Sequence, residues 1–417
     1  MELSIERKQV YALIARQLQD DGMHALAERV AQEVGVEIDA LLPRDELLSL
    51  YQQCLVGNRQ STLLADSSSP DEAMDLDDAT KQAESPKPKF AFVARFTAAH
   101  KSAVRTAAFS PDGALVASAS DDASIKILDV DKMHQHSSAR NVGANAESEA
   151  SKVVYRTFFD HQLPINDLAF HPTRPILVSC SKDASIKFFE HSRSSSRRSF
   201  RAIREKVDVR SVDFHPSGDY LLVGTQDHII RMFDCSSFQA FTSAELSKHH
   251  DAGVNSVKWC PTASLFVSCS SDGSIKLWDG VNFRCLRTIE QAHGGSSVQI
   301  SRFSSDGKFI LSGGEDSTAR IWDASSGKEI CALTSQSLGP SSRLKPCFMY
   351  DDRHVLGACD NSPNVFLWDS VSGNLIEEYQ GHNRSLYHIE ASPIEPSFIS
   401  CGDDNKARFW GLDDPLN

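Results

Sequence analysis

The chain has 417 residues, of which 41% are hydrophobic and 24% charged, and its formal net charge is −13. This length exceeds that of one ordinary compact core, so we expect several units or a repeat array. Because neutralisation of phosphates by Lys and Arg dominates nucleic-acid affinity, so acidic a chain is not expected to bind RNA or DNA strongly by itself. We also expect a soluble intracellular protein without membrane contact, since no run of about eighteen apolar residues and no signal-peptide core is found.

Residues 1–56 have the apolar periodicity of three short helices, separated by Gly22, Gly35 and Pro43. A unit of about 55 residues buries too little surface to be very stable alone, and pairing with a second copy is the simplest way to bury more. The run YALIARQLQDDGMHALAERV (11–30) is similar to LisH-type dimerisation helices. We therefore expect a helical homodimerisation domain whose contacts come from Val10, Leu13, Ile14, Leu18, Leu26, Val30, Val34, Leu47, Leu48 and Tyr51. The alternative is a monomeric helical cap.

Residues 57–89 are rich in Ser, Asp and Pro and poor in aromatic residues. This composition is typical of a disordered tether, and its acids cluster between Asp71 and Asp78. We expect an acidic linker.

One segment recurs along residues 90–417. Six copies align without a gap, namely SASDDASIKILD (118–129), SCSKDASIKFFE (179–190), VGTQDHIIRMFD (223–234), SCSSDGSIKLWD (268–279), SGGEDSTARIWD (312–323) and SCGDDNKARFWG (400–411). A seventh, GACDNSPNVFLWD (357–369), fits with one inserted residue. A period of about 45 residues, made of short alternating apolar runs between turn signals, is typical of a four-stranded propeller blade. The sequence predicts seven blades.

Four polar or aromatic positions repeat within these copies, and we expect them to form one hydrogen-bonded chain inside each blade. A His precedes a turn Asp by 22 or 23 residues, a strand Ser lies between them, and a Trp follows the Asp by six. Buried polar groups must be paired, because an orphan costs about 1–3 kcal/mol. The predicted network comprises His100, Ser118, Asp122, His161, Ser179, Asp183, Asp227, His250, Ser268, Asp272, Trp278, His293, Ser312, Asp316, Trp322, His382, Ser400, Asp404 and Trp410.

This repetition argues against a catalytic role for the Ser, His and Asp residues, because an enzyme needs one such group and not five. The third blade departs from the pattern at Glu205 and Val223, the sixth has no His, and Leu128, Phe189 and Phe233 replace Trp. We expect those blades to rely on apolar packing. The ten cysteines contain no CxxC pair, so neither disulfides nor zinc are indicated. We expect no catalytic residue, metal or cofactor.

The repeated segments resemble WD repeats. The resemblance implies a mainly β fold, a seven-bladed WD-repeat propeller over residues 90–417 preceded by the small all-α domain. The last copy ends at Trp410 with only seven residues beyond it, so its blade lacks an outer strand. Residues 90–96 resemble the outer strands of other blades, and we expect them to close blade 7.

Two other segments interrupt the repeats. Residues 131–152 are polar and without periodicity, which predicts a mobile loop. Residues 191–206 form the one basic run, for which contact with RNA phosphates, phosphorylation and simple solvation all remain open.

The whole chain resembles the WD-repeat subunits of the cleavage stimulation factor, which acts in cleavage and polyadenylation of messenger RNA 3′ ends. The likeness rests on ASIKILD, FHPSGDYLLVGTQ, GSIKLWDGVNFRC and DDNKARFW, and it includes Leu128, Phe233 and the front helices. It implies a non-enzymatic nuclear scaffold that homodimerises through residues 1–56. Its implied partners are the helical-repeat subunit and the RNA-binding subunit, with any contact to GU-rich RNA indirect or dependent on the complex.

Propeller geometry indicates where partners bind, since the loops that hold the His and the turn Asp emerge on one face near the axis. The candidate contacts are Lys101, Gln162, Lys182, Asp251, Ser271, Glu315, Asn383 and Arg384. The alternative function is a WD-repeat adaptor of a ubiquitin ligase or a chromatin corepressor complex. Dimer orientation, RNA affinity and regulatory partners do not follow from the sequence.

Overall fold

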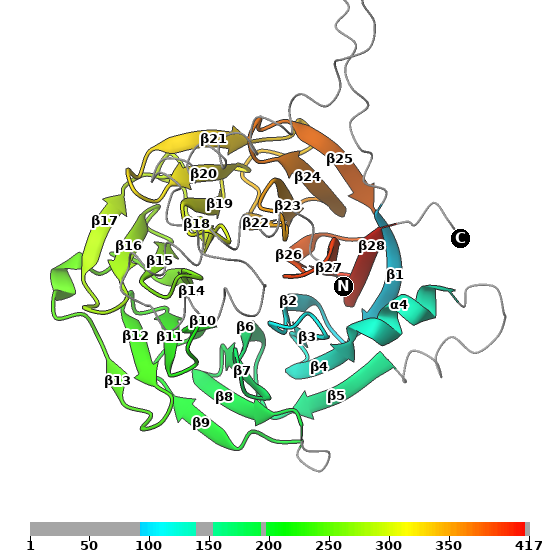
Figure 1. Ribbon diagram of the computed structural model, residues 1–417, viewed down its shortest axis with the longest axis horizontal. Helices are drawn as coiled ribbons and strands as arrows, with labels where there is room; N and C mark the ends of the chain where they lie inside the picture. The colour runs from blue at the N-terminus through cyan, green and yellow to red at the C-terminus, as the bar shows by residue number, and fades with distance from the viewer. Residues whose placement is uncertain (1–91, 139–152, 193–196, 413–417) are drawn as a thin grey trace, which may run out of the picture. The chain divides into compact units, whose positions relative to one another are not determined.

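A computed structural model of the chain describes residues 92–138, 153–192 and 197–412. Within these ranges the strands form seven four-stranded antiparallel sheets around a common axis (Figure 1). The predicted seven-bladed propeller is therefore confirmed. The predicted helices of 1–56 and the linker of 57–89 lie outside the described residues. No helix in the described part of the chain is long and apolar enough to cross a membrane.

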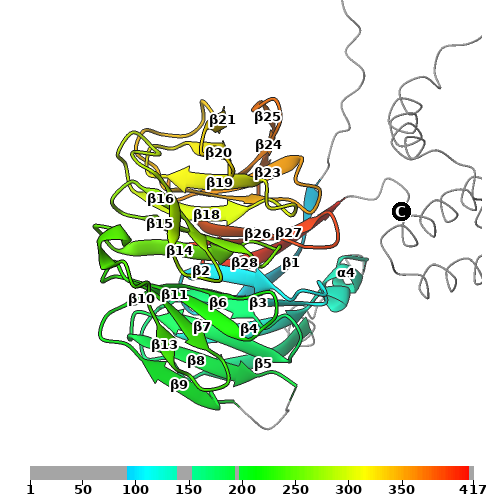
Figure 2. The same ribbon diagram turned by 60° about the vertical axis from the view of Figure 1, so that its left-hand side comes forward.

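Each blade runs from an inner strand near the axis to an outer strand at the rim, and Figure 2 shows the blades from the side. Blade 1 contains β2 (Val104–Phe109), β3 (Leu115–Ser120), β4 (Ser124–Asp129) and β5 (Val154–Phe159); blade 2 contains β6 (Ile165–Phe170), β7 (Ile176–Ser181), β8 (Ser185–Glu190) and β9 (Arg201–Arg204). Blade 3 contains β10 (Val209–Phe214), β11 (Tyr220–Thr225), β12 (Ile230–Asp234) and β13 (Ala240–Phe241); a 3-10 turn, η1 (Leu246–Lys248), leads to blade 4 with β14 (Val254–Trp259), β15 (Leu265–Ser270), β16 (Ile275–Asp279) and β17 (Cys285–Ile289). Blade 5 contains β18 (Val298–Phe303), β19 (Phe309–Gly314), β20 (Ala319–Asp323) and β21 (Glu329–Leu333); blade 6 contains β22 (Leu344–Phe348), β23 (His354–Cys359), β24 (Asn364–Asp369) and β25 (Leu375–Gln380). Blade 7 contains β26 (Leu386–Ala391), β27 (Ser397–Gly402), β28 (Lys406–Leu412) and β1 (Phe92–Ala99).

The ring closes by pairing β1, at the start of the described chain, with β28 at its end (Figure 1). The register runs from Phe92 opposite Leu412 to Ala99 opposite Lys406. The ring of Phe92 lies 5.1 Å from that of Phe398 and 5.5 Å from that of Tyr379, in edge-to-face contacts. The strand extends to Ala99, three residues beyond the expected 90–96, and residues 90 and 91 are outside the described range.

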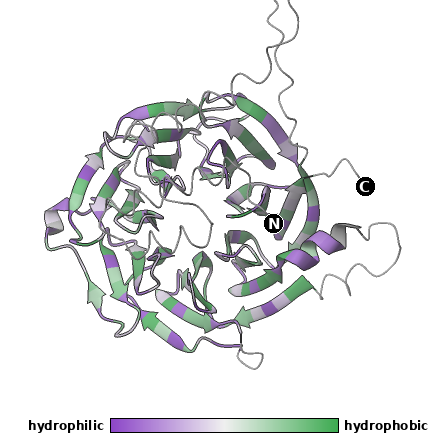
Figure 3. Ribbon diagram, in the orientation of Figure 1, coloured by the Kyte–Doolittle hydropathy of each residue, from purple (hydrophilic) through white to green (hydrophobic). Residues whose placement is uncertain are grey.

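The insertion in blade 1 differs from the expected mobile loop, because its first part is helix α4 (Val130–Ser138). Figure 3 colours α4 mainly hydrophilic, which explains why its sequence suggested a loop. Its anchor is Met133, which is fully buried in a cluster with Phe96 and Phe409. The His134 imidazole also lies 3.0 Å from a carboxylate oxygen of Glu395. The helix therefore packs against the strands that close the ring, and residues 139–152 are not described.

The predicted polar network joins buried His, Ser and Trp side chains to partly buried Asp side chains in the turns. In blade 4, His250 Nε2 lies 2.7 Å from Ser268 Oγ, and the Trp278 indole donates to the same oxygen at 2.8 Å. His250 Nδ1 lies 3.1 Å from a carboxylate oxygen of Asp272. Burial lowers the pKa of His250, whereas hydrogen bonds from His250 and Ser274 outweigh burial and lower the pKa of Asp272. The blade therefore holds a neutral imidazole against an ionised carboxylate.

Blades 5 and 7 have the same four-membered chain, through His293, Ser312, Asp316 and Trp322 and through His382, Ser400, Asp404 and Trp410. Blades 1 and 2 keep the imidazole–hydroxyl pair, with His100 Nε2 2.9 Å from Ser118 Oγ and His161 Nε2 2.6 Å from Ser179 Oγ. The His161 ring lies 2.9 Å from Asp183, whereas His100 is 3.7 Å from Asp122.

Blade 3 replaces the network with an ion-pair cluster and does not rely on apolar packing alone. Arg231 lies 2.7 Å from Asp227 and 3.5 Å from Glu205, the residue at the expected His position. Although burial opposes it, hydrogen bonding to Arg231 lowers the pKa of Asp227 to about 2. In blade 6 the Trp368 indole donates to the backbone oxygen of Thr334 at 3.0 Å.

The turn after each network Asp requires a left-handed residue. In six blades the next residue has a φ between 57° and 82°, and these residues are Ala123, Ala184, His228, Gly273, Ser317 and Asn405. Only blade 4 has Gly there. A Cβ at Gly273 would lie 3.0 Å from the backbone oxygen of Gly295. An L-residue with a side chain is strained in this conformation by about 1–2 kcal/mol.

We predict that Ala184→Gly stabilises the propeller by about 0.5–1 kcal/mol, because relief of the strained φ exceeds the added entropy of the unfolded chain. The matched control is Ala332→Gly on the exposed strand β21, which should destabilise by about 0.5–1 kcal/mol. Urea unfolding of the two variants and the parent measures both changes. Equal destabilisation by the two substitutions would contradict the strain argument.

Candidate binding site at the mouth of the central channel

Three of the eight predicted contact residues line one cavity. Lys182, Ser271 and Glu315 each immediately precede a network Asp, and they border a cavity of 430 Å³. The other five, Lys101, Gln162, Asp251, Asn383 and Arg384, are exposed but do not line it. Four of these five donate their backbone amides to network carboxylates, at 2.8 Å for Lys101, 3.1 Å for Gln162, 2.9 Å for Asp251 and 3.4 Å for Asn383. The structure therefore divides the predicted face into a cavity and a surrounding surface.

The wall of the cavity is formed by all seven inner strands. Each contributes its second residue, and we call this set the mouth ring: Arg105, Asn166, Arg210, Asn255, Gln299, Lys345 and Tyr387. The ring holds three cations and no carboxylate. Because every blade supplies one member, the cavity lies on the propeller axis at the end where the network turns emerge.

None of these seven residues is among the contacts predicted from the sequence, although the sequence holds a signal for them. In four blades the mouth-ring residue follows the network His by five positions, as Arg105, Asn166, Asn255 and Tyr387 do. The residue before each is an apolar residue buried at the start of the strand. Alternation along a strand turns the next side chain to the opposite face of the blade, and in this propeller those side chains line the cavity. The signal requires the blade register to be known.

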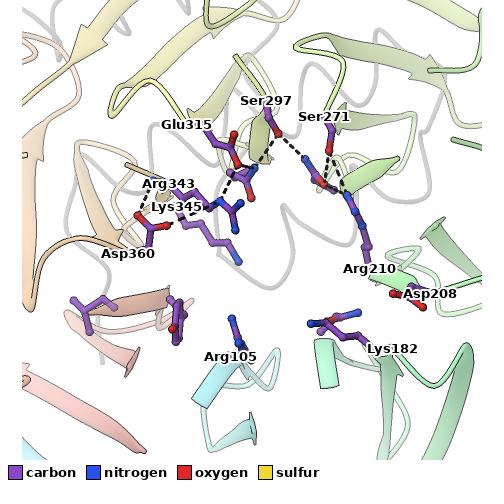
Figure 4. Close-up of a pocket in the computed structure, with 15 residues that line it drawn as sticks. Arg105, Lys182, Asp208, Arg210, Ser271, Ser297, Glu315, Arg343, Lys345 and Asp360 are labelled. Carbon is purple, nitrogen blue, oxygen red and sulfur yellow. Dashed lines mark hydrogen bonds and ion pairs between the residues drawn. The ribbon is translucent and has the colours of Figure 1, made fainter. Parts of the chain in front are cut away.

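Two cations at the mouth are neutralised by acids from neighbouring turns. Arg105 makes a bidentate contact with Asp121 at 2.8–3.0 Å, and its guanidinium lies 4.4 Å from the centre of the Tyr387 ring. Arg343 lies 2.7 Å from Glu315 and 4.0 Å from Asp360. Figure 4 shows Arg105, Arg343 and Lys345 directed toward the middle of the cavity.

Arg210 and Lys345 are different, because neither forms an ion pair with any carboxylate among the described residues. Arg210 donates to Asn255 and, at 3.3 Å, to the Ser271 hydroxyl, both of which are neutral. Burial lowers the pKa of Arg210, with Asp208 acting in the opposite direction. Burial also lowers the pKa of Lys345. The mouth therefore contains two cations whose desolvation is not offset by a partner.

A second cavity of 290 Å³ lies further along the inner strands, toward their last residues, and both of its cations have carboxylate partners. We call its charged residues the lower ring: Asp167, Asp213, Lys258, Arg302 and Glu390. Lys258 lies 3.4 Å from Asp167 and 3.7 Å from Asp213. Although burial opposes it, the nearby carboxylates of Asp167 and Asp213 raise the pKa of Lys258. Glu390 raises the pKa of Arg302 in the same way. Of these two cavities, the mouth is therefore the one that contains cations without a carboxylate partner.

This arrangement can bind an anion, since it presents unpaired cations beside fixed amides and hydroxyls in a partly enclosed space. Among residues 92–138, 153–192 and 197–412, no group of three or more His, Cys, Asp or Glu residues could hold a metal ion. None of the repeated network His and Asp residues lines the cavity.

We predict opposite effects for substitutions in the two rings. Glu390→Gln leaves Arg302 buried without its carboxylate and should destabilise the propeller by about 2 kcal/mol. Lys345→Met removes an unpaired cation and should leave stability within about 0.5 kcal/mol or raise it. Thermal and urea unfolding of both variants measure the difference. A large loss of stability from Lys345→Met would show that the mouth cation has a structural partner.

Comparison with known proteins agrees with this architecture. The WD domain, G-beta repeat family matches residues 91–129, 152–190, 197–234, 242–279, 283–323 and 373–411. Five of these segments hold an outer strand followed by the three inner strands of the next blade, whereas 242–279 begins just after β13. The three inner strands of blade 6, which lacks the His, are unmatched. The sequence repeat is therefore offset by one strand from the blade.

Individual relatives are of two kinds. The chain is 33% identical to "Cleavage stimulation factor subunit 50" of Arabidopsis thaliana over 97% of its own length and 95% of that protein. It is 30% identical to "Nuclear distribution protein PAC1" of Arthroderma otae, and 25% identical to "Nuclear distribution protein nudF" of Aspergillus niger. These two alignments cover 60% and 66% of this chain, and 59% and 65% of those proteins. The resemblance found in the sequence is confirmed: the chain belongs to the WD-repeat proteins and, among them, to the family of cleavage stimulation factor subunit 50.

Proposed function

We propose that this chain is a non-enzymatic scaffold subunit of a cleavage stimulation factor, acting in the nucleus in cleavage and polyadenylation of messenger RNA precursors. The observation that carries the proposal is the 33% identity over 97% of the chain, because it extends beyond the propeller into residues 1–89. A match confined to WD repeats would support only the fold. The burial of the repeated His residues, each beside a partly buried Asp in its own blade, favours a scaffold over an enzyme.

The scaffold role follows from two kinds of surface in one chain. We propose that residues 1–56 form a homodimer and that each propeller binds the helical-repeat subunit of the factor. Two copies joined at their helices would then hold two partner copies, which raises the effective concentration of each without any new contact. The exposed residues around the channel mouth, with Lys182, Ser271 and Glu315 inside it, are the proposed contact surface.

For RNA we propose an indirect role through the RNA-binding subunit. The net charge of −13 supports this division of labour, since a chain of this charge gains little from counterion release on its own. The alternative adaptor functions, in a ubiquitin ligase or a chromatin corepressor complex, would account for the propeller, whereas the 33% identity over 97% of the chain is to a cleavage stimulation factor subunit.

Affinity purification of the tagged full chain from nuclear extract tests the proposed function. We expect the other subunits of the cleavage stimulation factor to be recovered, together with further polyadenylation factors. A tagged 90–417 fragment is the matched control and should retain the propeller's direct partner. Recovery of ligase or corepressor subunits without any polyadenylation factor would refute the proposal.

Light scattering coupled to size-exclusion chromatography tests the proposed dimer. The full chain is expected at twice the mass of one chain, and the purified 90–417 fragment at the mass of one. Leu13→Asp/Leu18→Asp in the full chain should also give the single-chain mass, because charged residues would be buried in the predicted interface. A full chain that runs as a monomer at micromolar concentration would contradict dimerisation through residues 1–56.

A further inference from the structure

The unpaired cations at the channel mouth point to a particular ligand. We propose that the 430 Å³ cavity binds the phosphate group of a single phosphoserine or phosphothreonine side chain on a partner protein. The inference rests on the proposed scaffold role only in taking the partner to be a protein.

The charge of the cavity matches a phosphate dianion. Arg210 and Lys345 both lie on the wall, and neither forms an ion pair within the described part of the chain. A phosphorylated side chain carries a charge of about −1.5 to −2 and three strong acceptor oxygens at neutral pH. A single carboxylate would leave one of the two cations uncompensated. Phosphate is therefore the better match in charge and in number of acceptors.

Arg210 is held in place without being neutralised. Its guanidinium donates to the side chains of Asn255 and Ser271, which leaves its positive charge available. Asn255 is fixed in turn, since its amide nitrogen donates to the backbone oxygen of Val298 in the next blade at 2.7 Å. Asn166 makes the same bridge to Val209 at 2.7 Å. A cation already positioned by neutral groups loses little conformational entropy when an anion binds.

The surroundings of the cavity favour one phosphate on a peptide over a nucleic acid. The cavity is compact and enclosed by the inner strands of seven blades, whereas binding along a nucleic-acid backbone requires an extended basic groove. Acids also surround the site, since Asp208 and Asp360 line the cavity and Asp121 and Asp403 belong to the adjacent turns. These carboxylates repel a polyanion but accept basic residues beside a single phosphate. We therefore expect the phosphorylated residue to lie between neutral or basic neighbours.

The test measures binding of the purified full chain to three fluorescent pools of nine-residue peptides by anisotropy. The pools have phosphoserine, serine or glutamate at the centre and mixed neutral and basic residues elsewhere. The phosphoserine pool should bind at least tenfold more tightly than either of the others. Arg210→Gln and Lys345→Met should each weaken that binding about tenfold, as loss of one charge-assisted contact predicts.

The matched control is Arg284→Gln combined with Lys328→Met, which removes the same side chains from exposed positions outside the cavity and should leave binding unchanged. Thermal unfolding of each variant separates lost binding from lost folding. Equal binding of the three pools, or unchanged binding by both mouth variants, would overturn the proposal. Tighter binding of a mixed-sequence single-stranded RNA that depends on Arg210 and Lys345 would replace the peptide with a nucleic acid. Because only purified chain is used, none of these results depends on which complex the protein joins.

Discussion

Closure of the ring by β1 and β28 is the constraint on which the other features depend. An open array of seven sheets would expose an unpaired strand edge at each end, and nothing would fix the separation of its inner strands. Pairing from Phe92–Leu412 to Ala99–Lys406 removes both edges at once. It also brings the second residues of seven inner strands to one level around the axis, so that Arg105, Arg210 and Lys345 share a cavity although they are far apart in sequence.

The buried polar networks serve the cavity indirectly. In blade 4 the imidazole of His250 ties the inner edge of the blade to Asp272, and Asp272 in turn accepts the amides of Asp251 and Ser274. The turn held in this way includes Ser271, which reaches Arg210 across the boundary with blade 3. A group of residues that resembles a catalytic triad thus has a structural role, because it fixes the turn and with it the residue immediately before the Asp. This explains why the cavity-lining residues Lys182, Ser271 and Glu315 each precede a network Asp.

Much of the fold could be predicted because its determinants are local and repeated. The spacing from His to Asp to Trp recurs within single blades, so a sequence alone suffices to find it, and residues 90–96 could be assigned to blade 7 because they resemble the outer strands of other blades. Two features could not be read in this way. Helix α4 is hydrophilic along most of its length and depends on Met133 entering a cluster formed with Phe96 and Phe409. The lower ring depends on contacts between blades, such as Lys258 with Asp167, which no local pattern reveals. The mouth ring is only partly predictable. Its positions follow the repeat and can be found in the sequence, whereas the ion pairs of its charged residues cannot.

The contrast between the two rings indicates that the mouth is not explained by folding alone. Both rings lie on inner strands, so the same backbone geometry acts on each. In the lower ring, Lys258 and Arg302 have carboxylate partners, as buried charges require. In the mouth ring, Asn166 and Asn255 show that a neutral amide is enough to bridge neighbouring blades. Cations at Arg210 and Lys345 therefore add a desolvation cost that the fold does not need. Where one part of a structure breaks a rule that an adjacent part obeys, the departure points to a partner outside the chain.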